Sequence, residues 1–374
     1  MSKLNVGIVG CGMIVNPYLK ACGESAQLAL VACADLIEER AVEACGKYRE
    51  NGWGEARACS YAEMLQDDGV DLVMNLTNPR AHFALNMQAL EAGKHVHAEK
   101  PLAVTREEGQ RLLDAARKNG VRLGCAPDTF LGSGHQTARA IVDRGDIGEP
   151  TAVSLFFCGG GPDGYHQDPE FFFEEGAGPM FDVGVYVLTD TIQLLGPVQR
   201  VSALTKKTWE ERTILSKKKQ GQSMPVLVPT HCTASLAFES GVLGTFIASF
   251  DMKGGHHLPH IEIYGTEGTL AVPDPIGFGG KPKLFRPAER EKGWQEIEPT
   301  HGYTGNSRGI GAADMAAAAE AGRPHRASGE LAYHVLDVGL SVYDSADAGR
   351  AVDVASTVAR PPAFAEGLVA DVTG

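Results

Sequence analysis

Five short strand-like segments alternate with helix signals along the first 126 residues, and this alternation constrains the fold more than any other feature. The first two have the few polar residues expected of a strand that is buried on both faces of a sheet. The segments are LNVGIVG (4–10), ALVACADL (29–36), VDLVMNLT (70–77), KHVHAEKP (94–101) and VRLGCAP (121–127). Helical patches and capping boxes such as SYAE (60–63) and TREE (105–108) lie between them. Because strands joined through helices pair in parallel with right-handed crossovers, we expect a doubly wound parallel sheet.

The pattern changes after Pro127. A helix is expected at 134–144 and a second one around Asp182, and two late helices are expected near 311–321 and 330–348. Between these helices, strand-like runs follow one another directly at 198–205, 230–240, 242–252, 259–265 and 268–272. Such a succession predicts a large, mostly antiparallel sheet with one face able to cover a ligand.

A chain of 374 residues is too long for one ordinary core. We therefore predict an α/β protein with two domains, residues 1–126 carrying the parallel sheet and residues 127–374 forming an α+β domain. The late helices of the second domain are in a position to pack back on the first.

Composition excludes several classes of function. The formal charge of −13 argues against non-specific binding to nucleic acid or to an anionic membrane. No apolar run reaches the roughly 18 residues of a membrane span, and the N-terminus lacks the pattern of a signal peptide. The eight cysteines show no zinc-like spacing, and His256, His257 and His260 lack an acidic partner at helical spacing. We expect a cytoplasmic protein with reduced thiols and no metal site.

The junction of the first strand and the first helix carries Gly10-Cys11-Gly12. Such glycines permit a tight turn and let the backbone approach a pyrophosphate at a helix N-terminus. Val15 occupies the place of the third glycine in the usual pattern, which weakens it. Asp35 ends the second strand, where a carboxylate accepts the adenosine ribose hydroxyls and repels a 2′-phosphate. The pattern predicts a dinucleotide site that favours NAD over NADP; the alternative is that Asp35 only caps the next helix.

A second polar pattern interrupts the apolar stretch GPMFDVGVYVLTD (178–190). Asp182, Tyr186 and Asp190 lie four residues apart and would share one face of a helix. The simple interpretation is an acid favoured by the helix dipole and a tyrosine with its hydroxyl at the rim of the core. Lys100, in contrast, follows the fourth strand, at the edge where doubly wound sheets bind ligands.

These motifs, taken in order, resemble the Gfo/Idh/MocA oxidoreductase family over nearly the whole chain. They are the first strand with Gly10-Cys11-Gly12, Asp35 at the end of the second strand, TNP (77–79) followed by His82, EKP (99–101), and DVGVY (182–186). The resemblance implies a Rossmann domain for the dinucleotide, an open-faced antiparallel sheet over the substrate, and a homodimer or homotetramer. The family's catalytic Lys and Asp correspond to Lys100 and Asp182, and its His or Tyr corresponds to Tyr186. Since Tyr replaces the His of many sugar and inositol dehydrogenases, either Tyr186 or Lys100 remains a candidate proton carrier.

The resemblance also implies a wider set of contacts. The expected cofactor contacts are Gly10, Gly12, Met13, Ile14, Asp35, Thr77, Asn78, His82, Glu99 and Lys100. The expected substrate contacts are Asp128, Tyr165, His166, Asp182 and Tyr186. Three alternatives stay open: His82 is a surface residue, Asp128 caps a helix, and Arg308 either reaches the site or forms a surface salt bridge.

The function expected from this resemblance is an NAD-dependent dehydrogenase. Its substrate would be a small carbohydrate, namely a sugar, glycoside or cyclic polyol with a secondary ring hydroxyl, such as position 3 of a pyranoside. Tyr186 keeps a dihydrodiol- or aldose–ketose-type oxidoreductase open. A dinucleotide-binding regulator without turnover is a third possibility, but it predicts a damaged Lys, Asp and Tyr set.

Overall fold

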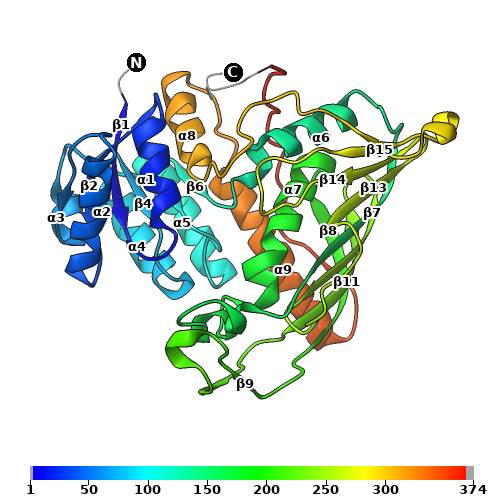
Figure 1. The fold of residues 1–374 in the computed structure, drawn as a ribbon, viewed down its shortest axis with the longest axis horizontal. Helices are drawn as coiled ribbons and strands as arrows, with labels where there is room; N and C mark the ends of the chain where they lie inside the picture. Colours follow the sequence, from blue (N-terminus) through cyan, green and yellow to red (C-terminus); the bar gives the residue numbers. More distant parts are fainter. Residues whose placement is uncertain (1–2, 368–374) are drawn as a thin grey trace.

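The computed structural model describes residues 3–367, which form two halves joined along one side (Figure 1). In the described part of the N-terminal half, six parallel strands pair in the order β3-β2-β1-β4-β5-β6. Their bounds are β1 Leu4–Val9, β2 Leu28–Ala34, β3 Arg57–Ala58, β4 Leu72–Asn75, β5 His95–Ala98 and β6 Leu123–Cys125. The predicted doubly wound sheet is therefore confirmed, with the short β3 as an additional edge strand.

The helices of this half lie between the strands, as the alternation predicts. They are α1 Val15–Glu24, α2 Glu38–Glu50, α3 Tyr61–Gln66, α4 Pro79–Glu91 and α5 Arg106–Asn119. Both predicted capping boxes are present, Ser60 with Glu63 before α3 and Thr105 with Glu108 before α5. Each box satisfies backbone N–H groups that the first helical turn leaves without partners.

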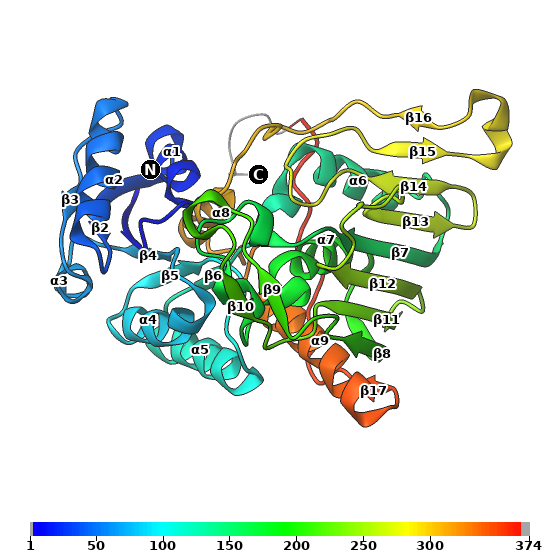
Figure 2. The ribbon, with the colours of Figure 1, turned by 60° about the horizontal axis from the view of Figure 1, so that its bottom comes forward.

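The C-terminal half contains a large mixed sheet (Figure 2). Within residues 3–367, nine strands pair in the order β16-β15-β14-β13-β7-β12-β11-β8-β17. Their bounds are β7 Pro150–Cys158, β8 Val198–Lys206, β11 His231–Phe238, β12 Leu243–Ser249, β13 Ile261–Gly265, β14 Thr269–Val272, β15 Lys283–Phe285, β16 Gln295–Glu296 and β17 Val352–Asp353. The pairing is antiparallel except that β12 runs parallel to β7. A separate hairpin of β9 Glu211–Thr213 and β10 Ser223–Pro225 lies outside this sheet.

Helices cover one face of the mixed sheet. These are α6 Ser133–Asp143, α7 Val185–Leu195 and α9 Gly329–Ala348, whereas α8 Ile310–Glu320 lies beside the N-terminal half (Figures 1 and 2). Burial alternates along β11 and β12, as it does when one face of a sheet is covered. The uncovered face carries exposed apolar side chains, among them Leu204, Leu243 and Tyr264. This half therefore has the open-faced sheet that was predicted.

The chain returns to the N-terminal half near its end. Ala327 accepts a hydrogen bond from the backbone N–H of Cys125 at 3.2 Å, and Ser328 forms a bridge with Gly124 beside β6. The Arg106 guanidinium of α5 pairs with the Asp337 carboxylate of α9. Apolar side chains from both halves belong to one core, so the two halves pack against each other. Among the described helices, none is both long and apolar enough to cross a membrane.

Candidate active site

The turn between β1 and α1 is closely packed at Gly10 and open at Gly12. Gly10 has φ of +91°, and a Cβ added to it would lie 2.8 Å from the Thr77 backbone nitrogen. A Cβ added at Gly12, by contrast, would meet no heavy atom within 4 Å. Met13 is 67% exposed. The turn is thus buried at Gly10 and open at Gly12 and Met13, at the start of a helix, where a pyrophosphate can approach the backbone.

Asp35 fixes this turn to the end of β2. Its carboxylate accepts the backbone N–H of Cys11 at 2.7 Å through Oδ2 and the backbone N–H of Ile37 at 2.9 Å through Oδ1. Each carboxylate oxygen can accept more than one hydrogen bond, so Asp35 retains capacity for ribose hydroxyls. The exposed glycine turn and the half-buried carboxylate together fit a dinucleotide.

The end of β4 presents Thr77 and Asn78 to the same crevice. The buried Asn75 side chain accepts hydrogen bonds from the backbone N–H of Thr77 at 3.1 Å and from its hydroxyl at 2.6 Å. Asn78 is exposed. His82 differs from the expectation of a cofactor contact, because its ring is completely buried. Its Nδ1 lies 2.7 Å from the Pro101 carbonyl and its Nε2 lies 3.0 Å from the Thr77 carbonyl, so the ring joins two loops beneath the crevice.

Lys100 and Asp182 bring the two halves into direct contact. Lys100 Nζ lies 2.6 Å from Asp182 Oδ1 and donates to the Asp182 carbonyl at 2.9 Å. The two side chains are only 16% and 11% exposed. Asp182 lies in a π-helical turn, Met180–Gly184, that leads into α7; such turns are frequent at functional sites. Burial alone would lower the pKa of Lys100, but the charge of Asp182, with Tyr186 and Glu99, raises it above its ordinary value.

Tyr186 lies in the first turn of α7, beside this ion pair. Lys100 Nζ is 5.5 Å from the centre of its ring, and the residue is 7% exposed. Burial raises the pKa of Tyr186 above its ordinary value, the Lys100 and Arg308 charges oppose the rise, and Glu99 adds to it. At neutral pH the phenol therefore holds its proton, and the Lys100 amine stays charged.

Two carboxylates that were expected to contact ligands, Glu99 and Asp128, accept hydrogen bonds from other groups of the protein. Glu99 accepts the Tyr18 hydroxyl at 2.7 Å and the Lys100 backbone N–H at 3.0 Å. Asp128 is 1% exposed, and its Oδ2 accepts the backbone N–H groups of Gly309 at 2.8 Å and Gly311 at 3.0 Å. Burial raises the pKa of Asp128 to about 6, although these two hydrogen bonds oppose the rise. The structure thus makes Asp128 the cap of α8 rather than a substrate contact.

The loop between β7 and α7 carries Tyr165 and His166, and part of it lines a pocket with the start of α4. Tyr165 is 67% exposed, and partial burial and the charge of Asp182 raise its pKa to about 12. The His166 ring packs edge-on against Phe171 and Phe172, with ring centres 5.3 and 5.0 Å apart. Tyr165 is thus exposed on this loop, while the His166 ring packs within it.

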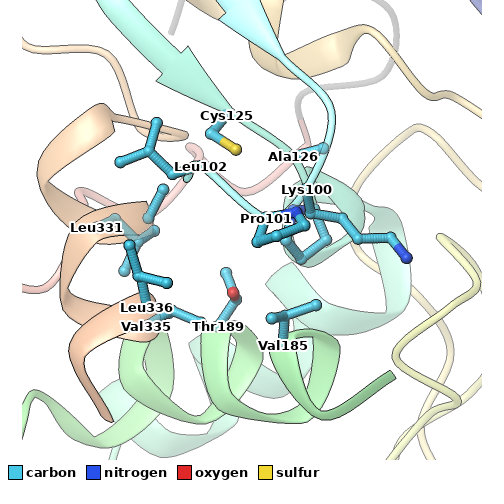
Figure 3. Close-up of a pocket in the computed structure, with 12 residues that line it drawn as sticks. Lys100, Pro101, Leu102, Cys125, Ala126, Val185, Thr189, Leu331, Val335 and Leu336 are labelled. Atoms are coloured by element: carbon cyan, nitrogen blue, oxygen red, sulfur yellow. The ribbon is translucent and has the colours of Figure 1, made fainter. Parts of the chain in front are cut away.

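Two cavities border the site. A cavity of about 20 Å³ lies behind the Lys100 backbone, and its lining is mostly apolar. Figure 3 shows the Lys100 side chain extending away from it, so this cavity is not where Lys100 meets a ligand. A larger pocket of about 200 Å³ lies where the start of α4 faces the loop before α7. Arg80 and Glu174, which line it, form an ion pair at 3.2 Å across the two halves.

The remaining polar residues separate into structural and site groups. Asp190 is buried and pairs with His135 Nδ1 at 2.7 Å, as expected of a structural residue. In the part of the chain that the structure describes, no group of three or more His, Cys, Asp or Glu residues is arranged to hold a metal ion. Arg308 donates to Asn306 Oδ1 at 3.1 Å, and its charge opposes the rise in the pKa of Tyr186. The sequence signal for Arg308 is its position in GNSRG, just before a helix.

Two family models match successive parts of the chain. Residues 4–126 match the family model described as "Oxidoreductase family, NAD-binding Rossmann fold". Residues 135–271 match the model described as "GFO/IDH/MocA C-terminal domain". The two matches together cover more than half of the chain.

Individual relatives are dehydrogenases and reductases of small carbohydrates. Inositol 2-dehydrogenase of Salmonella typhimurium is 34% identical over 155 residues, which are 40% of this chain and 44% of that protein. The chain thus matches less than half the length of that relative. 1,5-Anhydro-D-fructose reductase of Ensifer adhaerens is 28% identical over 313 residues, 82% of this chain and 86% of that protein. Levoglucosan dehydrogenase, solved with NADH and L-sorbose, has the same fold, with a TM-score of 0.82, 21% identity, and coverage of 95% of this chain and 99% of that chain.

Proposed function

Because the chain belongs to the GFO/IDH/MocA oxidoreductase family, with an NAD-binding Rossmann domain, we propose that it is an NAD-dependent dehydrogenase of carbohydrates. It oxidises a secondary ring hydroxyl of a sugar, glycoside or cyclic polyol to the ketone, reversibly. The observation that carries this proposal is the contact of 2.6 Å between Lys100 of the dinucleotide half and Asp182 of the other half, beside Tyr186. Position 3 of a pyranoside is the first ring position to test.

The cofactor is held by the residues whose geometry fits it. The glycine turn at Gly10 and Gly12 takes the pyrophosphate, and Asp35 takes the adenosine ribose. Thr77 and Asn78 border the path from there to Lys100. When NAD is bound, its nicotinamide accepts the hydride that leaves the carbinol carbon.

Lys100 stabilises the substrate oxygen. An ammonium group has three N–H donors, and within the described residues two of them bond Asp182, through its carboxylate and its carbonyl. The third can donate to the hydroxyl of the substrate, where negative charge develops as the proton leaves. Asp182 keeps the amine charged and in place, and its carboxylate has further capacity to accept a neighbouring hydroxyl of the sugar.

Tyr186 carries the proton. Since the pKa of Lys100 is raised, its amine does not accept a proton near neutral pH. The phenol of Tyr186 is protonated in the same range and is ready to act as the acid when a ketone is reduced. In the oxidising direction the phenolate takes the hydroxyl proton while the carbon loses hydride, so we expect oxidation to become faster as the pH rises.

Two further features belong to this proposal. The exposed face of the mixed sheet pairs between copies of the chain, giving a homodimer or homotetramer. Tyr186 in place of histidine also suits a dihydrodiol- or aldose–ketose-type oxidoreductase. A regulator without turnover is disfavoured, since Lys100, Asp182 and Tyr186 are all present and in one place.

The test is a substrate screen with the full-length protein. NAD⁺ and NADP⁺ are offered with pyranosides, inositols, free aldoses and a trans-dihydrodiol, and cofactor reduction is followed by absorbance. We expect turnover with NAD⁺ and a cyclic carbohydrate. Lys100→Met and Tyr186→Phe should each lower kcat/KM by about 10²–10⁴, while Arg200→Gln, far from the site on β8, should keep it. Activity that survives in both site variants, or a strong preference for NADP⁺, would contradict the assignment.

A further inference from the structure

A pocket between the two halves is lined by polar side chains and one aromatic ring. It measures about 200 Å³ and is lined from the start of α4 by Asn78, Pro79 and Arg80, and from the loop before α7 by Phe171, Glu174 and Glu175. Pockets that hold drug-sized ligands measure about 300–1,000 Å³, so this one suits a group of a single ring. Amide, carboxylate and guanidinium groups bind hydroxyls, and the face of an aromatic ring suits the C–H groups of a sugar.

The pocket adjoins the segments that carry Lys100 and Asp182. On the N-terminal half, the nitrogens of the His82 ring contact the Thr77 carbonyl at 3.0 Å and the Pro101 carbonyl at 2.7 Å. A single imidazole ring therefore joins the start of α4 to the segment of Lys100. On the other half, the loop that lines the pocket continues into the π-helical turn that contains Asp182. Each wall of the pocket is thus connected directly to the segment of one member of the ion pair.

Contacts within the protein hold both walls of the pocket in place. Phe173 is completely buried in a small core that it shares with side chains in and around the β9–β10 hairpin. The Phe171 ring packs against the Phe172 ring, with ring centres 4.0 Å apart. Arg80 and Glu174 join the two walls through an ion pair at 3.2 Å. Because the walls are already ordered, binding a ring between them requires little further ordering of the protein.

The charges of the lining distinguish a sugar from the phosphates of a dinucleotide. Arg80 is paired with Glu174, so their two charges largely cancel. Glu175 is exposed, and among residues 3–367 it forms no ion pair. One guanidinium and two carboxylates leave one negative charge in the lining. This charge opposes a phosphate or a carboxylate, but it does not oppose a neutral ring that carries hydroxyls.

We propose that this pocket is a subsite for the second sugar ring of a disaccharide, whose first ring is oxidised at Lys100 and Tyr186. This inference rests on the proposed function, and it narrows the substrate from any cyclic carbohydrate to one with two linked rings. The Phe171 ring packs against the C–H face of the second ring. Glu175 accepts hydrogen bonds from the hydroxyls of that ring, and the Asn78 amide can both donate and accept.

The first test compares two-ring and one-ring substrates in the full-length protein with NAD⁺. Maltose, cellobiose and lactose are offered beside the corresponding methyl glycosides. We expect kcat/KM for the preferred disaccharide to exceed that for its methyl glycoside by about tenfold or more. Phe171→Ala and Glu175→Gln should each reduce this ratio severalfold, and Phe171→Leu, which keeps an apolar side chain but not the flat ring, should reduce it too. Trp294→Ala, which removes an exposed aromatic side chain beside β16, should leave the ratio unchanged.

The second test separates the pocket from the cofactor site. NADH affinity is measured by fluorescence titration in the same variants, once thermal unfolding has shown that they are folded. We expect NADH affinity to be unchanged. Weaker NADH binding in Phe171→Ala and Glu175→Gln, together with an unchanged substrate ratio, would assign the pocket to the cofactor and overturn the inference.

The outcomes also distinguish this inference from the proposed function. Turnover of methyl glycosides without any preference for a disaccharide would overturn the inference and leave the dehydrogenase assignment intact. If no sugar is oxidised, the disaccharides are titrated by calorimetry into the NADH complex of the full-length protein. Disaccharide binding that Phe171→Ala weakens by about tenfold would then support the subsite and contradict the dehydrogenase assignment, whereas no binding would overturn the inference.

Discussion

A buried histidine close to the site predicts that the protein loses stability in mild acid. His97 lies in β5, its side chain is completely buried, and neither ring nitrogen has a hydrogen-bond partner in the described structure. Burial lowers the pKa of His97 to about 4, whereas a histidine in the unfolded chain titrates near about 6.5. Between these two values the unfolded chain binds a proton that the folded chain does not. The contribution to stability is thus present above about pH 6.5 and is lost as the pH falls toward 4.

The size of this loss follows from the two pKa values. Proton linkage gives a decrease of about 1.8 kcal/mol in the free energy of unfolding between pH 7 and pH 5 for one such histidine. Burial also lowers the pKa of His325 and of His334 to about 4. The three histidines together then remove about 5 kcal/mol, a large share of the roughly 5–15 kcal/mol that stabilises an ordinary folded protein.

The assay is urea unfolding of the full-length protein at pH 7 and pH 5, with His97→Leu as the main variant. Leucine has a similar volume and does not titrate, and its packing effect cancels because each protein is compared with itself at the two pH values. We expect His97→Leu to lose about 1.8 kcal/mol less than the unaltered protein. His257→Gln, at an exposed position in the loop before β13, should lose as much as the unaltered protein. Equal losses in His97→Leu and the unaltered protein would refute the reasoning.

Three further predictions concern the two halves of the site. Gly10→Ala should lower stability by about 1–2 kcal/mol, because φ there is +91°, whereas Gly12→Ala should be neutral in thermal unfolding; equal effects would contradict the turn geometry. Asp35→Ala should weaken NADH binding on the order of tenfold and reduce discrimination against NADPH in fluorescence titrations, and unchanged affinities would exclude its ribose role. Asp182→Asn and Lys100→Met should be coupled by about 2–3 kcal/mol in a double-mutant cycle of unfolding, and additive effects would show that the ion pair contributes little.

The sequence predicts the fold well where the signals are local. The apolar strands, the GxG turn and the capping boxes each depend on residues that are close together in the chain, and the structure contains all of them. The parallel contact of β12 with β7 was not predictable in this way. This pairing depends on which strands become neighbours in the sheet, and no short stretch of sequence indicates which strands those are.

The site shows the same limit at the level of single residues. Lys100 and Asp182, which the resemblance assigned to one site, are in contact. Asp128, however, resembles a ligand contact until its partners Gly309 and Gly311, far along the chain, are known. The position of His82 was likewise not predictable from nearby residues, because its ring contacts the Pro101 carbonyl in the loop that follows β5. For Arg308 the local signal is weak, since it consists only of a position just before a helix.

The return of the chain to β6 has a consequence for how the protein is made. Until the residues around Ala327 leave the ribosome, the edge of β6 that they pair with remains without its partner. Exposed strand edges invite pairing with other chains. The nascent dinucleotide half is therefore completed late in synthesis, and a fragment ending at residue 126 should aggregate unless the remaining segment is supplied to it.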